Sequence, residues 1–433
     1  MNDKDLDRRE FRRKRRIRNQ VIAYIVLVIL LAILGVGGFF GVRQVIAGIK
    51  EYDQKVIETM EQASENVETQ EAQESSTEET PEEQTQLEET EPEVVIDPLD
   101  ELVDTLIADM TLEEKIAGMF LVSPEAITGV AKAIQAGDST KKAIEQNPVG
   151  GLLYAEKNYQ SKEQFVTMIT NSQAYSKFPL FIAVSRECGA STAFGVTLTD
   201  GVSDIADKES ASIVYGLVGA GLAELGVNMN LAPLADVVAE DGNRELQGRT
   251  YGSDGESIAP FVEASVTALQ ESGISAVVNT FPGEGMVNDK MQLTKGVEEY
   301  KNSDFLSFAG AIKAGADAIM VSHYYASGIL GEDIPACLSS VVMQELLRDY
   351  LGFQGVIVTD YLNDTTVTSK YSAKDAAVQA ILAGADLLVE PKSYKEAYEG
   401  VLEAVSNGTI SEDRINESIH RIYKVKYKHA LEQ

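Results

Sequence analysis

The 433-residue chain has a formal net charge of −31, and this charge is distributed unevenly. Residues 1–50 carry 11 Lys and Arg against 4 Asp and Glu, whereas residues 51–97 carry one Lys against 17 Asp and Glu. The rest of the chain is also acidic, and an acidic surface repels phosphate backbones. The folded part of the chain is therefore not expected to bind nucleic acid.

The sequence contains two cysteines, Cys188 and Cys337, and no C-x-x-C motif. This excludes a disulfide framework. It leaves open one bridge in an oxidising compartment or two unpaired buried thiols, of which the second is favoured. The three histidines, His323, His420 and His429, are scattered along the chain. Their spacing does not indicate a metal site, and no cofactor is expected.

A basic segment, residues 1–20, precedes an apolar run, residues 21–42, that contains no charged residue. About 20 apolar residues in a helix cross a bilayer core of about 30 Å. A cleaved signal peptide would have an apolar core of only about 7–15 residues, so a retained transmembrane helix is favoured. Because Lys and Arg concentrate before the run, we expect a single-pass cell-membrane anchor with a cytoplasmic N-terminus and everything after it on the extracytoplasmic side.

Residues 43–97 are rich in Glu, Gln, Ser and Thr and contain few apolar residues. Such a segment cannot bury enough apolar surface to offset its ordering entropy, so we expect a disordered acidic linker. The folded domain is expected to span residues 98–433. Near its start, Thr111 and Glu114 have the spacing of a capping box, which predicts that a helix begins there.

Eight short apolar runs recur through this domain, and most of the intervals between them have a helical pattern, as in residues 259–273 and 341–352. The runs are residues 118–122, 151–155, 179–184, 227–236, 275–281, 318–324, 355–361 and 385–390. Near-continuous apolar strands are typical of parallel sheets that are buried on both faces. Eight strands alternating with helices predict an α/β fold, a (β/α)₈ TIM barrel, with a doubly wound open sheet as the alternative.

Polar side chains lie at or just after the C-terminal ends of six of these runs, where such barrels carry their chemistry. They are Glu187, Asp236, Glu284, His323, Asp360 and Glu390. Taken singly, each of these residues has an alternative interpretation, as a helix cap or as a polar group whose hydrogen bonds are formed within the fold. Several at one barrel mouth favour a functional site, because an uncompensated buried carboxylate costs several kcal/mol.

Several sequence motifs follow one another along this domain in a definite order. They are residues 110–120 (MTLEEKIAGMF), 179–189 (PLFIAVSRECG), 231–237 (LAPLADV), 248–254 (GRTYGSD), 281–283 (FPG), 316–323 (ADAIMVSH), 351–362 (LGFQGVIVTDYL), 383–388 (AGADLL) and 401–424. This set resembles glycoside hydrolase family 3, and more narrowly its single-domain β-N-acetylhexosaminidases that act on peptidoglycan sugars. The resemblance covers residues 106–428, essentially the whole folded domain.

The resemblance implies a carbohydrate substrate and a retaining mechanism, in which a carboxylate attacks the anomeric carbon and a second group protonates the leaving oxygen. Asp360, in the sequence VTDYL, stands at the position of the nucleophile; a strand-end Asp that caps the next helix is the alternative interpretation. Arg249 matches the arginine that binds the sugar. His323, Asp236 and Glu187 match substrate-binding positions at the pocket.

The sequence departs from the family pattern at several positions, as in a degenerate active site. Ser185 stands where the family motif D-x-E-G-G has the Asp that binds sugar hydroxyls. Asn279 and Thr280 replace the Lys and His of K-H-F-P-G-H-G. These substitutions remove side chains that contact substrate in the family.

The acid/base position also departs from the family pattern, because Lys290, Met291 and Gln292 align with the Asp-Ser-His loop of the hexosaminidases. A lysine titrates near pH 10.4 and an amide does not titrate, so neither type of side chain readily replaces the missing pair. Glu284 and Asp289 are the substitute acid/base candidates on the same loop. The alternative interpretation of both residues is an ordinary exposed carboxylate of the loop.

Two functions from different classes follow. The first is a retaining β-N-acetylhexosaminidase that acts on peptidoglycan aminosugars outside the membrane. The second is a catalytically inactive, membrane-tethered barrel that binds a glycan or a protein partner. A fold does not decide between them, since function depends on the site.

Overall fold

The computed structural model describes residues 97–187, 193–195 and 201–428. The chain divides into two compact units, Met1–Glu93 and Val94–Gln433, and all the described residues belong to the second. The predicted basic segment 1–20 and transmembrane helix 21–42 lie outside the described residues, as do Cys188 and all but the last residue of the predicted linker 43–97. Within the described part of the chain, no helix combines the length and apolar character needed to cross a bilayer.

Eight parallel strands form one sheet in the order β7-β6-β5-β4-β3-β2-β1-β8. Their bounds are β1 Phe120–Val122, β2 Gly151–Tyr154, β3 Phe181–Val184, β4 Met229–Asn230, β5 Ser275–Phe281, β6 Ala318–Val321, β7 Val356–Thr359 and β8 Leu388–Val389. Each strand falls inside one predicted apolar run, and every strand residue is buried. The runs are apolar throughout because both faces of the sheet are covered.

The two edges of this sheet meet, so the strands form a ring. β8 pairs with β1, where Phe120 lies opposite Leu388. On the other side a single parallel bridge joins Val358 of β7 to Leu387, the residue before β8. The predicted (β/α)₈ barrel is therefore confirmed, with the β7–β8 junction its least extensively paired part, and the open-sheet alternative is wrong.

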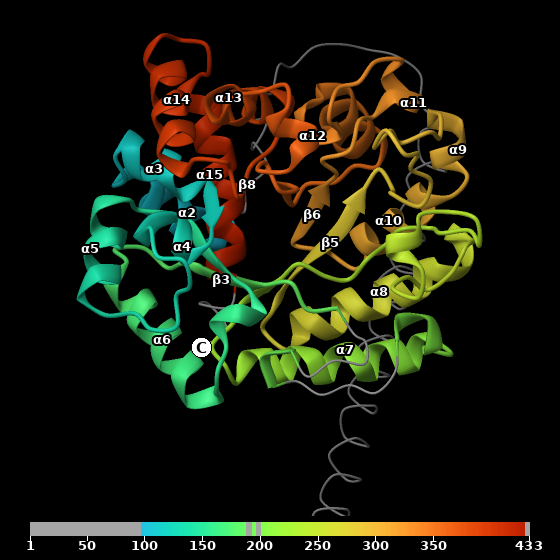
Figure 1. Ribbon diagram of the computed structural model, residues 1–433, viewed down its shortest axis with the longest axis horizontal. Helices are drawn as coiled ribbons and strands as arrows, with labels where there is room; N and C mark the ends of the chain where they lie inside the picture. The colour runs from blue at the N-terminus through green and yellow to red at the C-terminus, as the bar shows by residue number, and fades with distance from the viewer. Residues whose placement is uncertain (1–96, 188–192, 196–200, 429–433) are drawn as a thin grey trace, which may run out of the picture. The chain divides into compact units, whose positions relative to one another are not determined.

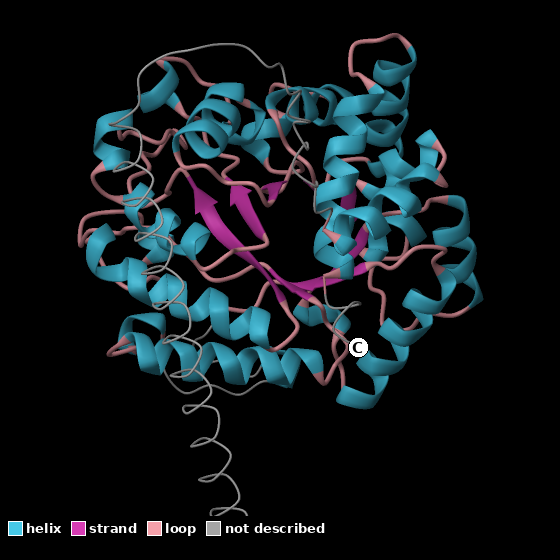
Figure 2. Ribbon diagram, turned by 180° about the vertical axis from the view of Figure 1, so that it is seen from behind, coloured by secondary structure: helices cyan, strands magenta, loops and turns pink. Residues whose placement is uncertain are grey.

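Helices surround the strands (Figure 2). The longer ones are α2 Pro98–Ala108, α3 Leu112–Gly118, α5 Asp138–Gln146, α6 Lys162–Tyr175, α7 Lys208–Ala223, α8 Gly255–Glu271, α10 Asp304–Lys313, the π-helix η6 Val341–Tyr350, α13 Ala373–Ala383, α14 Tyr394–Ser406 and α15 Glu412–Tyr427. The shorter ones are α4 Pro124–Thr128, α9 Val297–Lys301, α11 Ser327–Leu330, α12 Thr365–Thr368 and the 3₁₀ turns η1 Glu156–Asn158, η2 Ala193–Gly195, η3 Val202–Asp204, η4 Arg244–Leu246 and η5 Ala336–Leu338. The last helix, α15, packs against α2 and α3, which brings the two ends of the domain together (Figure 1).

Local capping explains where several helices begin. The predicted capping box is confirmed, because the Thr111 hydroxyl accepts from the backbone N–H of Glu114 and the Glu114 carboxylate accepts from that of Thr111. Helix α8 begins at Gly255 rather than at residue 259, since the Asp254 side chain caps it by accepting from the N–H of Ser257. The helix predicted at 341–352 is present as η6, wound as a π-helix.

Candidate active site

Three titratable side chains converge at the C-terminal ends of neighbouring strands. Glu284 follows β5, His323 follows β6 and Asp360 directly follows β7. One ligand atom from each, a carboxylate oxygen or a ring nitrogen, lies within 4.8 Å of the other two. These sequence-predicted residues therefore form one cluster at the barrel mouth, where barrel enzymes place their chemistry.

Glu284 is held in this cluster by its backbone and by a hydroxyl. The pairing of β5 with β6 shifts register between Val278 and Phe281, as strands often do beside active sites. Beyond this shift, the Glu284 N–H donates to Asp236 Oδ1 at 2.6 Å, and Ser322 Oγ donates to Glu284 Oε1 at 2.5 Å. Glu284 is only 8% exposed, so its interpretation as an exposed loop carboxylate is wrong.

Asp289, the other acid/base candidate, is exposed and lies outside the cluster. Asp236 is fully buried, and its second carboxylate oxygen accepts from the N–H of Thr280 at 3.1 Å. Its two oxygens therefore bind the backbone of the end of β5 and of the loop that follows it. This geometry makes Asp236 an anchor for the Glu284 loop, whereas the resemblance implied contact with substrate.

The two buried carboxyl groups hold their protons tightly. Burial, together with the nearby Asp360 and Asp236 carboxylates, raises the pKa of Glu284 to about 8. Burial and the nearby Asp304 raise the pKa of Asp236 to about 7, although both of its hydrogen bonds from backbone N–H groups oppose that rise. At neutral pH Glu284 is therefore mostly a neutral acid that can donate a proton.

His323 and Asp360 form a contacting pair within the cluster. Nδ1 of His323 contacts Oδ2 of Asp360, and the N–H of Tyr361 donates to Asp360 Oδ1 at 2.8 Å. Burial disfavours the charged imidazole, but the Asp360, Glu284 and Asp364 carboxylates outweigh burial and raise the pKa of His323 to about 9. Asp360 therefore has an imidazolium beside it at neutral pH.

Arg249 and Glu187 form a separate pair at the rim of the mouth. Nε of Arg249 donates to Glu187 Oε2 at 2.9 Å, and Nη2 donates to Oε1 at 2.5 Å. The Arg249 side chain is 46% exposed. The hydrogen bonds that Arg249 donates to Glu187, together with the charge of that carboxylate, raise the pKa of this guanidinium above its ordinary value. The arginine predicted to bind sugar is therefore oriented by a carboxylate and still reaches solvent.

A cavity of about 380 Å³ opens at the mouth, at the ends of β1, β2, β3, β7 and β8. Its lining consists of Ser123, Glu125, Leu153, Tyr154, Ala155, Glu156, Lys157, Asn158, Ser185, Phe194, Tyr361, Asn363 and Glu390. Glu390 holds a left-handed backbone conformation with φ of 45°, and its carboxylate accepts from the N–H of Ser123. Because Tyr361 follows Asp360 in the chain, the cavity and the cluster meet at the end of β7.

Sequence reasoning missed two residues that support the cluster. Ser322 hydrogen-bonds Glu284, and Asp364 Oδ1 lies 3.9 Å from Nε2 of His323. The sequence could have indicated both residues by their position. Ser322 directly precedes His323, and Asp364 lies in the loop that begins with Asp360. Cys337, in contrast, is buried and has no disulfide partner among the described residues. Because Cys188 lies outside them, the choice between one bridge and two free thiols stays a prediction.

The glycosyl hydrolase family 3 N-terminal domain matches residues 111–425, a range that contains all eight strands. The chain belongs to glycosyl hydrolase family 3. This membership confirms the resemblance drawn from the sequence motifs.

Curated relatives of this family 3 chain include a β-N-acetylglucosaminidase/β-glucosidase of Cellulomonas fimi, 26% identical over 346 residues that cover 75% of this chain and 59% of the relative. A β-hexosaminidase A of Pseudoalteromonas piscicida is 26% identical over 325 residues, covering 66% of this chain and 54% of the relative. The chain thus spans little more than half the length of these two relatives. A β-hexosaminidase of Xanthomonas oryzae pv. oryzae is 28% identical over 283 residues, 60% of this chain and 81% of the relative.

Solved structures give the same family. A family 3 β-N-acetylglucosaminidase from Paenibacillus matches with a TM-score of 0.69 and 30% identity, covering 75% of this chain and 64% of the other. A β-N-acetylhexosaminidase from Beutenbergia cavernae matches with a TM-score of 0.65 and 26% identity, covering 74% of this chain and 99% of the other.

Proposed function

We propose that this chain is a retaining glycosidase of the β-N-acetylhexosaminidase type. The observation that carries the proposal is the pairing of Glu284 with Asp360, whose carboxylate oxygens lie within 4.8 Å of each other. Retaining glycosidases hold their two carboxyl groups about 5–5.5 Å apart, whereas inverting enzymes need about 6.5–9.5 Å. The separation in this barrel therefore supports retention.

The surroundings of the two carboxyl groups suit the two different roles that this reaction requires. Asp360, beside the His323 imidazolium, is the nucleophile that bonds to the anomeric carbon. Glu284, with its pKa raised to about 8, donates its proton to the leaving oxygen. In the second step the Glu284 carboxylate takes a proton from water, and the hydroxide oxygen displaces Asp360 from the sugar.

The relatives' names support an N-acetyl aminosugar as substrate, and we extend this to the aminosugars of peptidoglycan. The cavity beside Asp360, at about 380 Å³, is within the size range of small-ligand sites and is lined by tyrosines and polar groups that suit a sugar. The composition of residues 21–42 supports attachment to the cell membrane, with the barrel on the extracytoplasmic side.

An aryl N-acetyl-β-glucosaminide assay on the detergent-purified full-length chain tests the activity. We expect turnover by the wild type, release of the sugar with its β configuration, and background rates for Asp360→Asn. Equal near-zero rates for both proteins would remove the hydrolase proposal.

The second candidate is a catalytically silent barrel that binds a glycan or a protein partner. One observation favours it, because the cavity lining contains Ser185 and Glu390 but not Glu284, His323 or Asp360. Binding of peptidoglycan fragments, measured by calorimetry on a protein without turnover, would support the glycan-binding form. Absence of both turnover and glycan binding would favour a protein partner.

A further inference from the structure

The cavity at the barrel mouth lies beside the proposed catalytic groups rather than around them. Its lining comes from the ends of β1, β2, β3, β7 and β8 and the segments that follow them, and among the described residues Glu284, His323 and Asp360 do not contribute to it. We infer that this cavity binds a second aminosugar, joined to the one whose anomeric carbon meets Asp360. The inference rests on the proposed glycosidase activity, and it makes the interior of a β-linked aminosugar chain the substrate rather than only its end.

The leaving group and the cavity lie on different sides of Asp360. In the ring of strands, β6 and β5 lie on one side of β7, whereas β8 followed by β1, β2 and β3 lies on the other. Glu284, which protonates the leaving oxygen in the proposed mechanism, follows β5. A sugar whose first carbon meets Asp360 while its leaving oxygen meets Glu284 therefore extends its far end toward the cavity. The next unit of a chain is attached at that far end.

Ser185 leaves room in the cavity at the end of β3. It is exposed and lines the cavity, and it stands where the family motif has an Asp that binds sugar hydroxyls. A serine side chain is shorter and carries no charge, so space that the Asp would fill stays open. The substitution removes one contact to the first sugar, and it also opens space for a second one.

Buried hydrogen bonds fix the cavity wall that α4 and η1 form. Asn158, which has no exposed surface, donates to Glu125 Oε1 at 2.7 Å and to the carbonyl oxygen of Ala133 at 2.8 Å. Its own Oδ1 accepts from the N–H of Ala155 at 2.8 Å, and Glu125 Oε1 also accepts from the N–H of Ala133 at 2.8 Å. The wall is therefore ordered before a ligand binds, which lowers the entropic cost of binding.

Charged and polar groups of the cavity suit a sugar unit. The Glu390 backbone has a φ of 45°, and such a conformation in a residue with a side chain is strained and is often found at functional sites. Its carboxylate accepts from the N–H of Ser123 and, at 3.4 Å, from the Ser123 hydroxyl, so it is held in place. Lys157 is 49% exposed, with Nζ 3.4 Å from Glu125 Oε1. A fixed carboxylate and an ammonium group complement hydroxyl and acetamido groups, which both donate and accept hydrogen bonds.

The experiment compares two 4-nitrophenyl β-glycosides on the detergent-purified full-length chain, one of N-acetylglucosamine and one of its β-1,4-linked disaccharide. In the second substrate the nitrophenyl group occupies the leaving-group side, so the additional sugar has to enter the cavity. We expect nitrophenol and the intact disaccharide to appear together from the start of the reaction. An enzyme that removes single sugars from a chain end would instead release N-acetylglucosamine first and nitrophenol only after a lag.

Two variants and a matched control locate the binding of the second sugar. Ala155 is exposed and lines the cavity, so Ala155→Trp should lower kcat/KM for the disaccharide glycoside relative to the single-sugar glycoside by about tenfold or more, since one methylene group in a pocket is already worth about 10–200-fold. Ser185→Asp, which restores the family residue, should change this ratio in the same direction. Ala220→Trp, at an exposed alanine of α7, is the control and should leave the ratio as in the wild type.

The inference and the proposed activity fail in different ways. Release of N-acetylglucosamine as the first product of the disaccharide glycoside, or turnover of the single-sugar glycoside alone, would overturn the inference and leave the proposed activity in place. An equal effect of Ala155→Trp and Ala220→Trp on the ratio would also overturn it. Absence of turnover with both glycosides would remove the proposed activity and the inference with it.

Discussion

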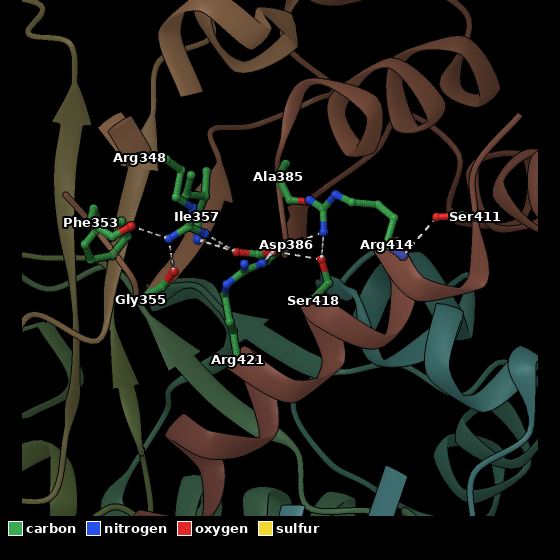
Figure 3. A network of polar contacts seen from close by, with 10 residues as sticks. All are labelled: Arg348, Phe353, Gly355, Ile357, Ala385, Asp386, Ser411, Arg414, Ser418 and Arg421. Atoms are coloured by element: carbon green, nitrogen blue, oxygen red, sulfur yellow. Dashed lines mark hydrogen bonds and ion pairs between the residues drawn. The ribbon is translucent and has the colours of Figure 1, made fainter. Parts of the chain in front are cut away.

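Two buried clusters of charged side chains lie at opposite ends of the barrel, and they satisfy their charges differently. Before β8, the Asp386 carboxylate accepts from Arg348 Nη2 at 2.7 Å, Ser418 Oγ at 2.7 Å and Arg421 Nη1 at 3.1 Å (Figure 3). It also accepts from the N–H of Ile357 at 3.0 Å. This single carboxylate has no exposed surface and is fully paired.

The mouth of the barrel shows the opposite arrangement. Glu284, Asp236 and Asp360 are all buried. Glu284 and Asp360 share one cluster with His323, Asp236 binds the N–H of Glu284, and the pKa values of Glu284 and Asp236 are raised to about 8 and 7. At the N-terminal end of the strands, the ion pairs and hydrogen bonds of Asp386 thus hold β7, β8, η6 and α15 together. The C-terminal end keeps groups that can exchange protons, as expected of a functional site.

The largest expected effect is at the fully paired end. Asp386→Ala leaves Arg348, Arg414 and Arg421 partly buried without their common partner. Breaking a buried ion pair by removing one partner costs about 3–5 kcal/mol, so we expect the free energy of unfolding to fall by that amount. Urea unfolding of the full-length chain, followed by circular dichroism, measures it.

Glu403→Ala provides the control for Asp386→Ala. Its ion pair with Lys374 is on the surface, with side-chain exposures of 64% and 42%, so its loss should cost under about 1 kcal/mol. If Asp386→Ala cost no more than this control, the idea that the two ends differ in structural importance would be wrong.

At the mouth, the next largest expected effect is on rate. Glu284→Gln cannot donate a proton, so it should lower kcat on an aryl N-acetyl-β-glucosaminide about 10²-fold, the low end for loss of acid catalysis because an aryl group leaves readily. Wild-type activity should fall as pH rises through about 8, where Glu284 loses its proton, and the variant should lack that limb. Asp289→Asn, on the exposed part of the same loop, distinguishes the two sequence candidates and should keep the wild-type profile.

The free energy of unfolding should also depend on pH through Glu284. The folded pKa of Glu284 is raised from 4.5 to about 8, so its stabilising contribution is complete below pH 4.5 and is lost as pH rises through 8. Because Gln cannot ionise, Glu284→Gln should become more stable than the wild type as pH rises from 5 to 8, by about 1–3 kcal/mol. Thermal melts at these two pH values test this, and a constant difference would contradict the raised pKa.

The barrel could be predicted from the sequence because its signal is local and repeated. Each apolar run that is buried on both faces contains one strand, and Thr111 with Glu114 marks a helix start through a contact between near neighbours. The start of α8 was misplaced because hydrophobic periodicity does not report the cap at Asp254, which lies outside the apolar pattern. The π-helical winding of η6 has no comparable sequence signal.

The candidate site was predictable in part. Strand ends identified Glu284, His323 and Asp360, because parallel strands bring their C-terminal ends to one mouth. Burial of Glu284 was missed, since it depends on Asp236, at the end of a different strand. Asp236 accepts hydrogen bonds from the backbone N–H of Thr280, in β5, and from that of Glu284 in the loop after it. The same long-range geometry explains why Asp289, close to Glu284 in sequence, lies outside the cluster.

The pair between Glu187 and Arg249 should give the smallest effect and is intermediate between the two clusters. Its two hydrogen bonds are well formed, but the Arg249 side chain is 46% exposed, so water and salt screen the attraction. We expect Glu187→Gln to lower the free energy of unfolding by about 0.2–1 kcal/mol, and the difference to shrink in 1 M salt. A loss above 2 kcal/mol that persists in salt would show that the rim is built like the Asp386 cluster, to hold the fold. A small, salt-sensitive loss means that the barrel depends little on this pair, so that Arg249 can exchange Glu187 for a ligand at low cost.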